Sequence, residues 1–533
     1  MRRELRVLIV LAVTAMLLIS APMPPVQAAA SDLDPTFGQG GRVTTAFGKG
    51  GDFAYALAIQ SDGKIVAAGT VNGLSDFGLA RYNVNGSLDS SFGTGGKVTT
   101  SFFGIGAQAR AMAMQPDGKI VAAGFAYSPS VGGIFALARY NADGSLDSSF
   151  GSGGTVTTNL PGDLDEAHAV MIQSDGKIVA AGQTLYMFGN SDFAVTRYNV
   201  DGSLDSSFGS GGKVTTDLFG GSIESAQAVV IQPDDKIVAA GVVARPGSNL
   251  DFALTRYNAD GSLDPMFGEG GKVTTDFAGG VDFATALALQ SNGRIVAAGA
   301  GQNAFSGTDD FALVRYNADG GLDSNFGTGG RVTTDFFGNS DFANAIAIQS
   351  NGKIVAAGFA DNPSIHGGLF GLARYNIDGS RDTTFGLDGK VTTDFPGRLE
   401  VANAVAIQAD GKIVAAGSYG DFDITNHFAL ARYIGDSLDI CLQDDSNGNI
   451  LQFNSTSGEY LFTNCAGLTL TGKGSITTRG GIITLQQFGP DRRVVARIDR
   501  GVNAGTATIQ LFSSGTTFSI TDRNTTNNTC VCR

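Results

Sequence analysis

A six-residue motif, Lys/Arg-Ile-Val-Ala-Ala-Gly, occurs seven times in this chain at intervals of 55 to 59 residues. Each copy belongs to a unit of four short, β-rich stretches: Val-Thr-Thr, an Ala-rich stretch ending in Gln, the hexapeptide, and a stretch ending in Arg-Tyr. A four-stranded unit cannot bury both of its faces alone, so the units must stack, and this period is typical of propeller blades. The sequence therefore predicts an all-β, seven-bladed β-propeller. The copies begin at Lys64, Lys119, Lys177, Lys236, Arg294, Lys353 and Lys412.

The order of the four stretches predicts how the ring closes. A Val-Thr-Thr stretch at residues 42–45 precedes the first Ala-rich stretch, and none follows the last Arg-Tyr pair at Arg432 and Tyr433. Small Ala side chains suit the crowded centre, whereas the Lys and Thr residues of Val-Thr-Thr stretches suit an exposed edge that must resist unwanted pairing. We expect the strand order Ala-rich, hexapeptide, Arg-Tyr, Val-Thr-Thr from inside to outside. The N-terminal strand then completes the seventh blade.

Two kinds of turn connect the expected strands. Asp-Gly before the hexapeptide is a hairpin signal for positive backbone φ, and Asp235 replaces the Gly once. The second turn, at residues 141–147, carries several carboxylate and amide oxygens. Its Gly is fourth, whereas a helix-loop-helix calcium site requires Gly sixth and an acid twelfth. We interpret it as a plain turn.

The N-terminus and the charge indicate an exported protein. Residues 1–30 combine three Arg, an apolar run and Ala28-Ala29-Ala30, which is the pattern of a secretory signal peptide. Its removal takes the net charge from −14 to −16, which argues against a nucleic-acid partner. No later stretch has the length and hydrophobicity of a membrane span. We expect a secreted protein that is located in the periplasm, at the cell surface or in the medium. We expect no cofactor and no membrane span.

The last segment differs from the repeats and is expected to form a module of its own. The propeller is assigned to residues 31–436 and a small all-β module to residues 437–533, where alternating runs replace the repeat. All four cysteines lie in this module and are expected to form two disulfides. A bond between neighbours separated by one residue would be strained, so each of the last two cysteines is expected to pair with one of the first two. A zinc site is the alternative, but the two-residue Cys spacing is missing. The cysteines are Cys441, Cys465, Cys530 and Cys532.

The repeat unit resembles a known family. Leu-Asp-Ser-Ser-Phe-Gly at residues 146–151, Gln-Ser-Asp-Gly-Lys-Ile-Val-Ala-Ala-Gly at 173–182 and Arg-Tyr-Asn at 197–199 resemble the delta-60 repeat of bacterial exported proteins. The resemblance covers residues 32–433 and implies a propeller, with no established activity or ligand. The tail also looks like a Cys-containing module found on exported bacterial proteins. Neither resemblance supplies an active site.

Variation between the repeats gives the candidate site. Aligned on their closing Gln, the Ala-rich stretches have Ala at alternate positions, with one variable polar residue between the first two Ala residues. Inner strands of a propeller begin on one face, so these seven side chains are expected to ring the mouth of the central channel and bind a ligand there. They are Tyr55, Arg110, His168, Gln227, Thr285, Asn344 and Asn403. Acidic residues just upstream predict an acidic mouth: Asp52, Asp165, Glu224, Asp282, Asp341 and Glu400, with Ala107 as the exception.

Loops between the second and third strands differ in length and content and are expected on the same face. Variable loops on a constant scaffold are typical of a binding surface. The sequence therefore favours a monomeric binding scaffold with a protein, peptide or glycan partner. The alternative is unselected drift in surface loops.

An enzyme is the minority interpretation. The chain has no Gly-x-Ser-x-Gly elbow, no closely spaced metal-ligand pair and no Gly-rich phosphate loop. Tyr55, Arg110 and His168 occupy equivalent positions in consecutive blades, so they could act as base, acid and cation in β-elimination of an acidic polysaccharide. His366 and His427 are expected in loops of the same face. Such a trio also arises by chance in a ring of polar residues.

The Arg of each Arg-Tyr pair and the Asp of each Leu-Asp-x-x-Phe-Gly segment repeat with the fold. We expect them to form structural ion pairs within or between blades. The Phe of the same segment, such as Phe92, is expected to pack between blades.

Overall fold

The computed structural model describes residues 31–435, apart from 49, 188, 221–222, 245–248, 278, 303–306, 366, 396, 398 and 421–425, together with the backbone of strands between residues 440 and 521. The expected signal peptide lies outside the described residues. So do three of the cysteines, at positions 465, 530 and 532. Cys441 lies in a described strand, but its side chain does not belong to the described part.

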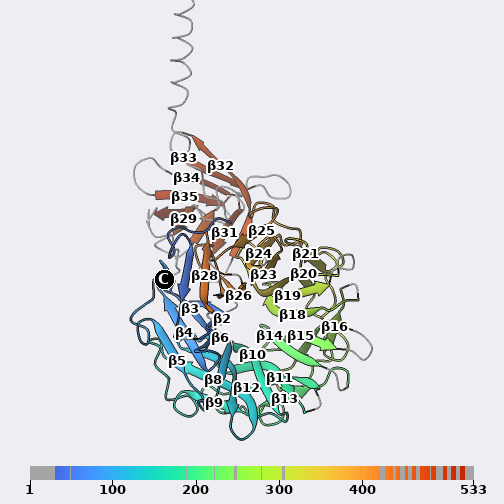
Figure 1. Cartoon of the computed structure of the whole chain (residues 1–533). Coiled ribbons are helices and arrows are strands. Elements are labelled where there is room, and N and C mark those ends of the chain that lie inside the picture. Colours follow the sequence, from blue (N-terminus) through green and yellow to red (C-terminus); the bar gives the residue numbers. More distant parts are fainter. Residues whose placement is uncertain are drawn as a thin grey trace, which may run out of the picture.

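The repeats form seven four-stranded antiparallel blades arranged in a ring (Figure 1). The inner strands are β2 (Phe53–Ile59), β6 (Ala107–Met114), β10 (Leu164–Ile172), β14 (Glu224–Ile231), β18 (Phe283–Leu289), β22 (Asp341–Ile348) and β26 (Leu399–Ile407). The second strands, which contain the hexapeptides, are β3 (Ile65–Val71), β7 (Ile120–Ser128), β11 (Ile178–Leu185), β15 (Ile237–Ala244), β19 (Ile295–Gln302), β23 (Ile354–Asn362) and β27 (Ile413–Gly420). Each inner strand contacts the inner strand of the next blade, and β26 contacts β2, so the ring is closed.

The outer half of each blade consists of an Arg-Tyr strand and a short edge strand. The Arg-Tyr strands are β4 (Asp76–Tyr82), β8 (Gly132–Tyr140), β12 (Ser191–Tyr198), β16 (Leu250–Tyr257), β20 (Asp309–Tyr316), β24 (Gly367–Tyr375) and β28 (His427–Tyr433). The edge strands are β5 (Lys97–Thr100), β9 (Thr155–Thr158), β13 (Lys213–Thr216), β17 (Lys272–Thr275), β21 (Arg331–Thr334), β25 (Lys390–Thr393) and β1 (Arg42–Thr45). The predicted fold class and strand order are confirmed.

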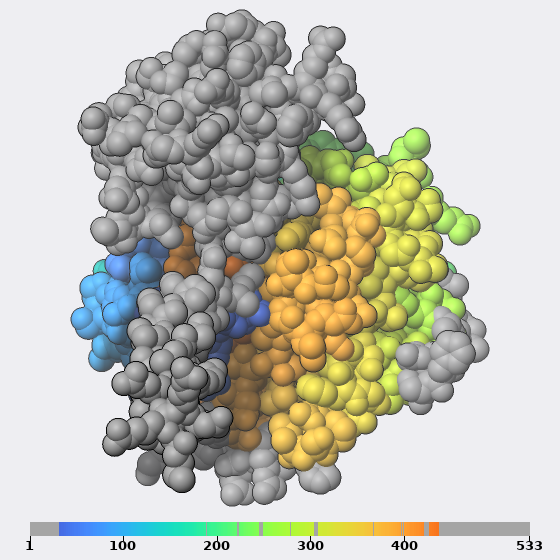
Figure 2. Space-filling model, turned by 90° about the horizontal axis from the view of Figure 1, so that it is seen from above, coloured from blue at the N-terminus to red at the C-terminus, as the bar shows by residue number. Residues whose placement is uncertain are grey.

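The N-terminal segment closes the ring, as predicted. Strand β1 pairs antiparallel with β28, with Val43 opposite Leu430. In the space-filling view, dark blue N-terminal residues lie beside the orange residues of the last repeats (Figure 2). The segment also supplies Asp34, whose carboxylate lies 2.9 Å from the Arg432 guanidinium. It therefore contributes both the edge strand and the ion pair that the seventh blade lacks.

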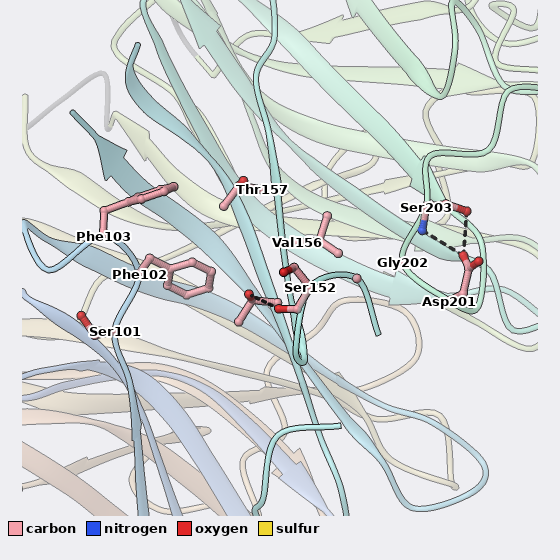
Figure 3. A pocket seen from close by; sticks show the side chains of 11 residues that line it. Ser101, Phe102, Phe103, Ser152, Val156, Thr157, Asp201, Gly202 and Ser203 are labelled. Atoms are coloured by element: carbon pink, nitrogen blue, oxygen red, sulfur yellow. Dashed lines mark hydrogen bonds between the residues drawn. The ribbon is translucent and has the colours of Figure 1, made fainter. Parts of the chain in front are cut away.

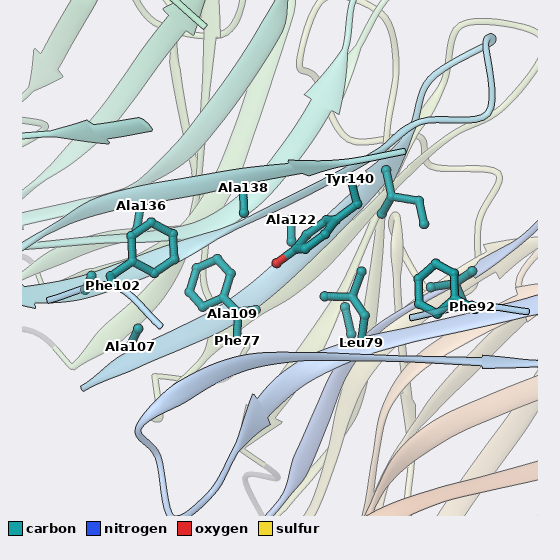
Figure 4. Close-up of a cluster of buried hydrophobic side chains, with 14 residues drawn as sticks. Phe77, Leu79, Phe92, Phe102, Ala107, Ala109, Ala122, Ala136, Ala138 and Tyr140 are labelled. Atoms are coloured by element: carbon teal, nitrogen blue, oxygen red, sulfur yellow. The ribbon is translucent and has the colours of Figure 1, made fainter. Parts of the chain in front are cut away.

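Hydrophobic side chains fill the space between neighbouring blades. Phe92 is fully buried in a cluster that joins the first and second blades and includes Phe77, Leu79 and Tyr140 (Figure 4). The Arg81 guanidinium covers the Phe92 ring at 4.6 Å from its centroid. The expected packing of this Phe between blades is confirmed.

In six of the seven repeats, the Arg-Tyr pair connects three blades. Arg81 donates to Asp89 of its own blade at 2.8 Å and also to the Ala142 carbonyl of the next blade. The hydroxyl of Tyr82 donates to Thr45 on the edge strand of the preceding blade at 2.9 Å. All seven Tyr residues make this bond to a Thr of the preceding blade. The structural role expected for the Arg residues is confirmed.

The C-terminal part is also all-β. It forms an eight-stranded sheet in the order β33-β32-β31-β30-β29-β36-β35-β34. The strands are β29 (Ile440–Gln443), β30 (Ile450–Phe453), β31 (Glu459–Thr463), β32 (Thr469–Arg479), β33 (Ile482–Gln487), β34 (Ala496–Arg500), β35 (Thr506–Leu511) and β36 (Thr517–Thr521). Within the described residues, no helix has the length and apolar character needed to span a membrane.

Candidate functional site

The seven variable polar residues all lie at β-bulges of the inner strands. In the first blade, Ala54 pairs with Gly69 and Ala56 pairs with Ala68, which leaves Tyr55 as the extra residue. The same irregularity occurs in every other blade around the residue that the sequence singles out. All seven side chains are half-buried. Because bulges redirect side chains and are frequent beside active sites, the bulge distinguishes this position from the rest of the strand.

The Gly that ends each hexapeptide permits the bulge. A Cβ on Gly182 would overlap the carbonyl oxygen of Glu166 and approach the backbone of Ala167. The corresponding Gly of every other blade faces the same carbonyl contact. Only Gly allows such a close backbone approach. The recurring hexapeptide Gly was therefore a sequence signal for the bulge, and sequence reasoning missed it.

Tyr55 and Arg110 are brought together across the first two blades. The Arg110 guanidinium lies over the Tyr55 ring at 4.5 Å from its centroid and 5.8 Å from that of Phe125. Its Nε is buried and has no hydrogen-bond partner among the described residues. A stacked guanidinium with a free donor is suited to binding an anionic group.

His168 pairs with an acid that the sequence analysis did not single out. Its Nε2 lies 3.4 Å from a carboxylate oxygen of Glu166, and its Nδ1 lies 3.0 Å from the Ala226 carbonyl. Gln183 donates to the same Glu166 oxygen at 3.0 Å. Although burial opposes it, the hydrogen bond and charge of His168 and the charge of Arg110 lower the pKa of Glu166. The lowered pKa favours the ionised form of Glu166 beside His168 and Arg110.

The other ring residues mainly bond to neighbouring backbone. Thr285 donates to the Ala343 carbonyl at 2.5 Å, and Asn344 donates to the Ala402 carbonyl at 3.1 Å. Asn403 donates to the Ala54 carbonyl at 2.9 Å, which links the last blade to the first. Gln227 donates to Ser225 at 2.8 Å. This half of the ring helps to hold the inner strands together, and Tyr55, Arg110 and His168 form its chemically distinct part.

Residues two positions before the bulge form a second layer with two different halves. The polar half contains Gln108, Glu166 and Ser225. The aromatic half contains Phe283 and Phe342, whose rings stack with centroids 6.1 Å apart. Phe53 stacks on Tyr55 at 6.3 Å, beside the polar half. The ring thus offers a surface with adjacent polar and aromatic parts.

The expected acidic mouth is wrong. Asp52, Asp165, Glu224, Asp282, Asp341 and Glu400 are fully buried, with no exposed surface. They accept hydrogen bonds from backbone N–H groups of the preceding connection, such as that of Phe336 to Asp341 at 2.7 Å and that of Phe395 to Glu400 at 2.8 Å. Burial raises the pKa of Asp282 to about 6, of Asp341 to about 7 and of Glu400 to about 8. Among the described residues, the buried backbone N–H groups have no other partner, so an acidic side chain is needed at this position to accept their hydrogen bonds. The six acidic side chains therefore point toward these N–H groups and away from the channel.

Three of these buried acids each belong to a cluster of three acidic residues, and this cluster recurs in consecutive blades. Their ligand atoms lie within 4.8 Å of one another, and carboxylates are suitable ligands for Ca²⁺ or Mg²⁺. The groups recur with the repeat and their innermost acids already accept backbone bonds, so we assign no ion to them. They are Asp192, Asp217 and Glu224; Asp251, Asp276 and Asp282; and Asp310, Asp335 and Asp341.

The loops on the bulge face expose apolar side chains. Tyr127, near the end of β7, is 39% exposed. Met187 is 81% exposed in the connection between β11 and β12, and Ile105 is 57% exposed in the connection that leads to β6. The backbone N–H of Tyr127 donates to the Gly106 carbonyl at 2.9 Å, so the end of β7 adjoins the connection that leads to β6. The sequence predicted that His366 and His427 lie in loops of this face. His427 is instead the first residue of β28, and position 366 lies outside the described residues.

Comparison with known families agrees with this architecture. Seven segments match the family model described as Domain of unknown function (DUF5122) beta-propeller, at residues 60–92, 115–150, 173–208, 232–267, 290–326, 349–385 and 408–436. Each segment contains one hexapeptide. The chain is a β-propeller repeat protein. No curated protein shows significant similarity to it.

Three solved structures illustrate the likeness, which concerns the fold alone. A catalytically inactive virginiamycin B lyase from Staphylococcus aureus with quinupristin is 10% identical, with 73% of this chain and 98% of that chain covered and a TM-score of 0.40. A polysaccharide lyase of family PL25, an ulvan lyase, is 11% identical, with coverage of 74% and 96% and a TM-score of 0.41. A protein of unknown function from Dyadobacter fermentans is 10% identical, with coverage of 75% and 99% and a TM-score of 0.36.

Proposed function

We propose that this protein is an exported binding scaffold whose partner binds at the bulge ring and the variable loops of the same face. The Tyr55–Arg110 pair is the observation that carries the proposal. Its guanidinium is oriented by an aromatic ring, and its buried Nε has no partner among the described residues. A buried donor of this kind is costly unless a ligand satisfies it.

The surroundings of Arg110 define the chemistry of the partner. A carboxylate or sulfate group would satisfy Arg110, and sugar or aromatic rings would pack on Phe53 and Tyr55. Apolar residues such as Ile105 and Tyr127 extend this surface. An acidic glycan or an acidic peptide has both features. The expected signal peptide and the delta-60 resemblance support export, and the destination is part of this proposal.

Immobilised glycan and peptide arrays, followed by calorimetry on the best ligand, test the proposal. Simultaneous replacement of Tyr55, Arg110 and His168 by Ala is expected to abolish detectable binding without unfolding the protein. Arg110→Lys keeps the charge but loses the planar fork, and should weaken binding at least tenfold. Arg381→Lys, in an exposed turn outside the bulge ring, is the matched control. Unchanged affinity in the triple variant would refute this site.

A second candidate function is β-elimination of an acidic polysaccharide, favoured by the His168–Glu166 pair. The pair orients the imidazole in the blade next to that of Arg110, where it could act as a general acid near a carboxylate-binding cation. Incubation with uronate-containing polysaccharides would then give unsaturated products that absorb in the near ultraviolet. His168→Ala would reduce this rate by roughly 10²–10⁴-fold. If the wild type binds a ligand on the arrays but generates no product that absorbs in the near ultraviolet, the lyase is ruled out and the binding scaffold is supported.

A further inference from the structure

Cationic side chains on the edge strands connect neighbouring blades. In β5, the Lys97 ammonium donates to the Ala46 carbonyl of the preceding blade at 3.0 Å and lies 5.7 Å from the centroid of the Phe47 ring. In β25, Lys390 donates to the Asp335 carbonyl at 2.8 Å and lies 5.6 Å from the Phe336 ring. The ammonium of each therefore occupies a small site made of one carbonyl and one aromatic face.

Two further edge strands place a lysine at the same carbonyl. Lys213 donates to the Asn159 carbonyl and Lys272 to the Asp217 carbonyl, both at 2.8 Å. In each case the acceptor is the residue directly after the preceding edge strand. The site is thus a regular feature of the blade junctions and takes a primary ammonium group.

Strand β9 departs from this pattern, because Thr155 stands where the other edge strands begin with Lys or Arg. The Thr155 hydroxyl donates to the Ser152 carbonyl of its own turn at 3.1 Å. By the repeat, the equivalent carbonyl and aromatic ring of the preceding blade belong to Ser101 and Phe102. This junction has the acceptor and the ring but no ammonium group of its own edge strand.

A pocket of about 720 Å³ occupies this junction. It is lined by Ser101, Phe102 and Phe103 on one side and by Val156 and Thr157 of β9 in the middle (Figure 3). Thr155 is also one of the lining residues. The turn with Asp201 forms the other side. Hydrogen bonds from Ser203 lower the pKa of Asp201, so its carboxylate adds negative charge to the wall. The volume lies within the range of small-ligand sites.

We propose that this pocket binds a lysine side chain of a partner protein or peptide. The incoming ammonium would donate to the Ser101 carbonyl and lie near the Phe102 ring, as Lys97 and Lys390 do at their junctions. The aliphatic stem would pack on the exposed Phe103, and Asp201 would attract the charge. This site lies on the edge strands and is separate from the bulge ring.

Titration with Nα-acetyl-lysine N-methylamide, followed by NMR, tests the assignment. The wild type is expected to bind one equivalent, and the Nε-acetylated compound, which lacks the charge, is expected to bind at least tenfold more weakly. Thr155→Lys supplies the missing ammonium and should also reduce affinity at least tenfold. Thr155→Ser is the control and should bind like the wild type. Lys390→Thr, at the junction that also carries two consecutive Phe residues, Phe336 and Phe337, should create a second site.

Equal affinity of the wild type and Thr155→Lys for the lysine amide would overturn the proposal. Equal binding of the charged and Nε-acetylated compounds would also overturn it. Should Thr155→Lys fail to fold, Thr155→Met fills the space with an uncharged stem and must still displace the ligand. Failure of glycan binding at Arg110 leaves these outcomes unchanged, so the two sites are tested independently.

Discussion

Buried carboxylates at the start of the inner strands show how one residue type can mislead a sequence analysis. Acidic residues near a channel suggest an acidic lining, but Asp341 and Glu400 are buried and bonded to backbone N–H groups. The sequence shows the position of these acids along the strand and not the orphan donors of the preceding connection. Their pKa values are raised because burial disfavours the charged form.

These acids predict a pH dependence of stability. Burial raises the pKa of Glu400 to about 8, above its value of about 4.3 in an unfolded chain, so the folded state binds the proton more tightly. Stability is therefore expected to fall as pH rises from about 4.3 to about 8. Glu400→Gln keeps an acceptor for Phe395 and removes the titration, so its melting temperature relative to the wild type should increase between pH 5 and pH 9. A pH-independent difference would contradict this assignment.

At the scale of the element, the inner strand and the hexapeptide strand act as one unit. The bulge residue varies while the opposing Gly is retained in all seven repeats, because a Cβ at the Gly would overlap the bulged backbone. The sequence singled out the residue that lies at the irregularity of each inner strand. It did not predict that this residue lies at a β-bulge, because Ala at every second position is the pattern of a regular strand.

Gly182→Ala tests the dependence of the bulge on Gly. The added methyl group would meet the Glu166 carbonyl, and overpacking of this kind typically costs about 1–3 kcal/mol. Urea denaturation measures the loss. Gly321→Ser is a suitable control, because five other repeats carry Ser at that turn position, and its effect should stay within about 0.5 kcal/mol. A neutral Gly182→Ala would mean that the bulge does not need Gly.

The N-terminal strand is the second element with a specific prediction. Deletion of residues 32–47 removes β1 and Asp34, which leaves an open edge on β28 and Arg432 without its carboxylate. The melting temperature is expected to fall sharply, whereas deletion of residues 1–31 should leave it unchanged. Cooperative melting of the longer truncation at the wild-type temperature would show that ring closure does not depend on this strand.

At the scale of the whole molecule, repetition explains why the fold could be predicted. Seven copies fixed the blade number, and the position of the Val-Thr-Thr stretch fixed the closure by β1. The contacts of Arg110 could not be predicted in the same way, because Tyr55 and Glu166 reach it from other blades. Repeats give the scaffold its regularity, and differences between repeats give the two candidate sites.

Disulfides in the C-terminal part remain a prediction. Loss of one disulfide typically costs about 2–5 kcal/mol in small secreted domains, so a reducing agent should lower the melting temperature of residues 437–533. The propeller contains no Cys and should melt as before. Differential scanning calorimetry would resolve the two transitions. Four reactive thiols in the denatured, unreduced protein would rule out the cross-links.

A crystal structure with the best array ligand tests the central claim most directly. The bulge ring is the proposed binding site, so ligand density is expected over Tyr55 and Arg110, with an anionic group of the ligand within hydrogen-bond distance of the Arg110 guanidinium. His168 and Phe53 should border the same density. Density confined to the repetitive turns of the opposite face, with the bulge ring unoccupied, would contradict the claim.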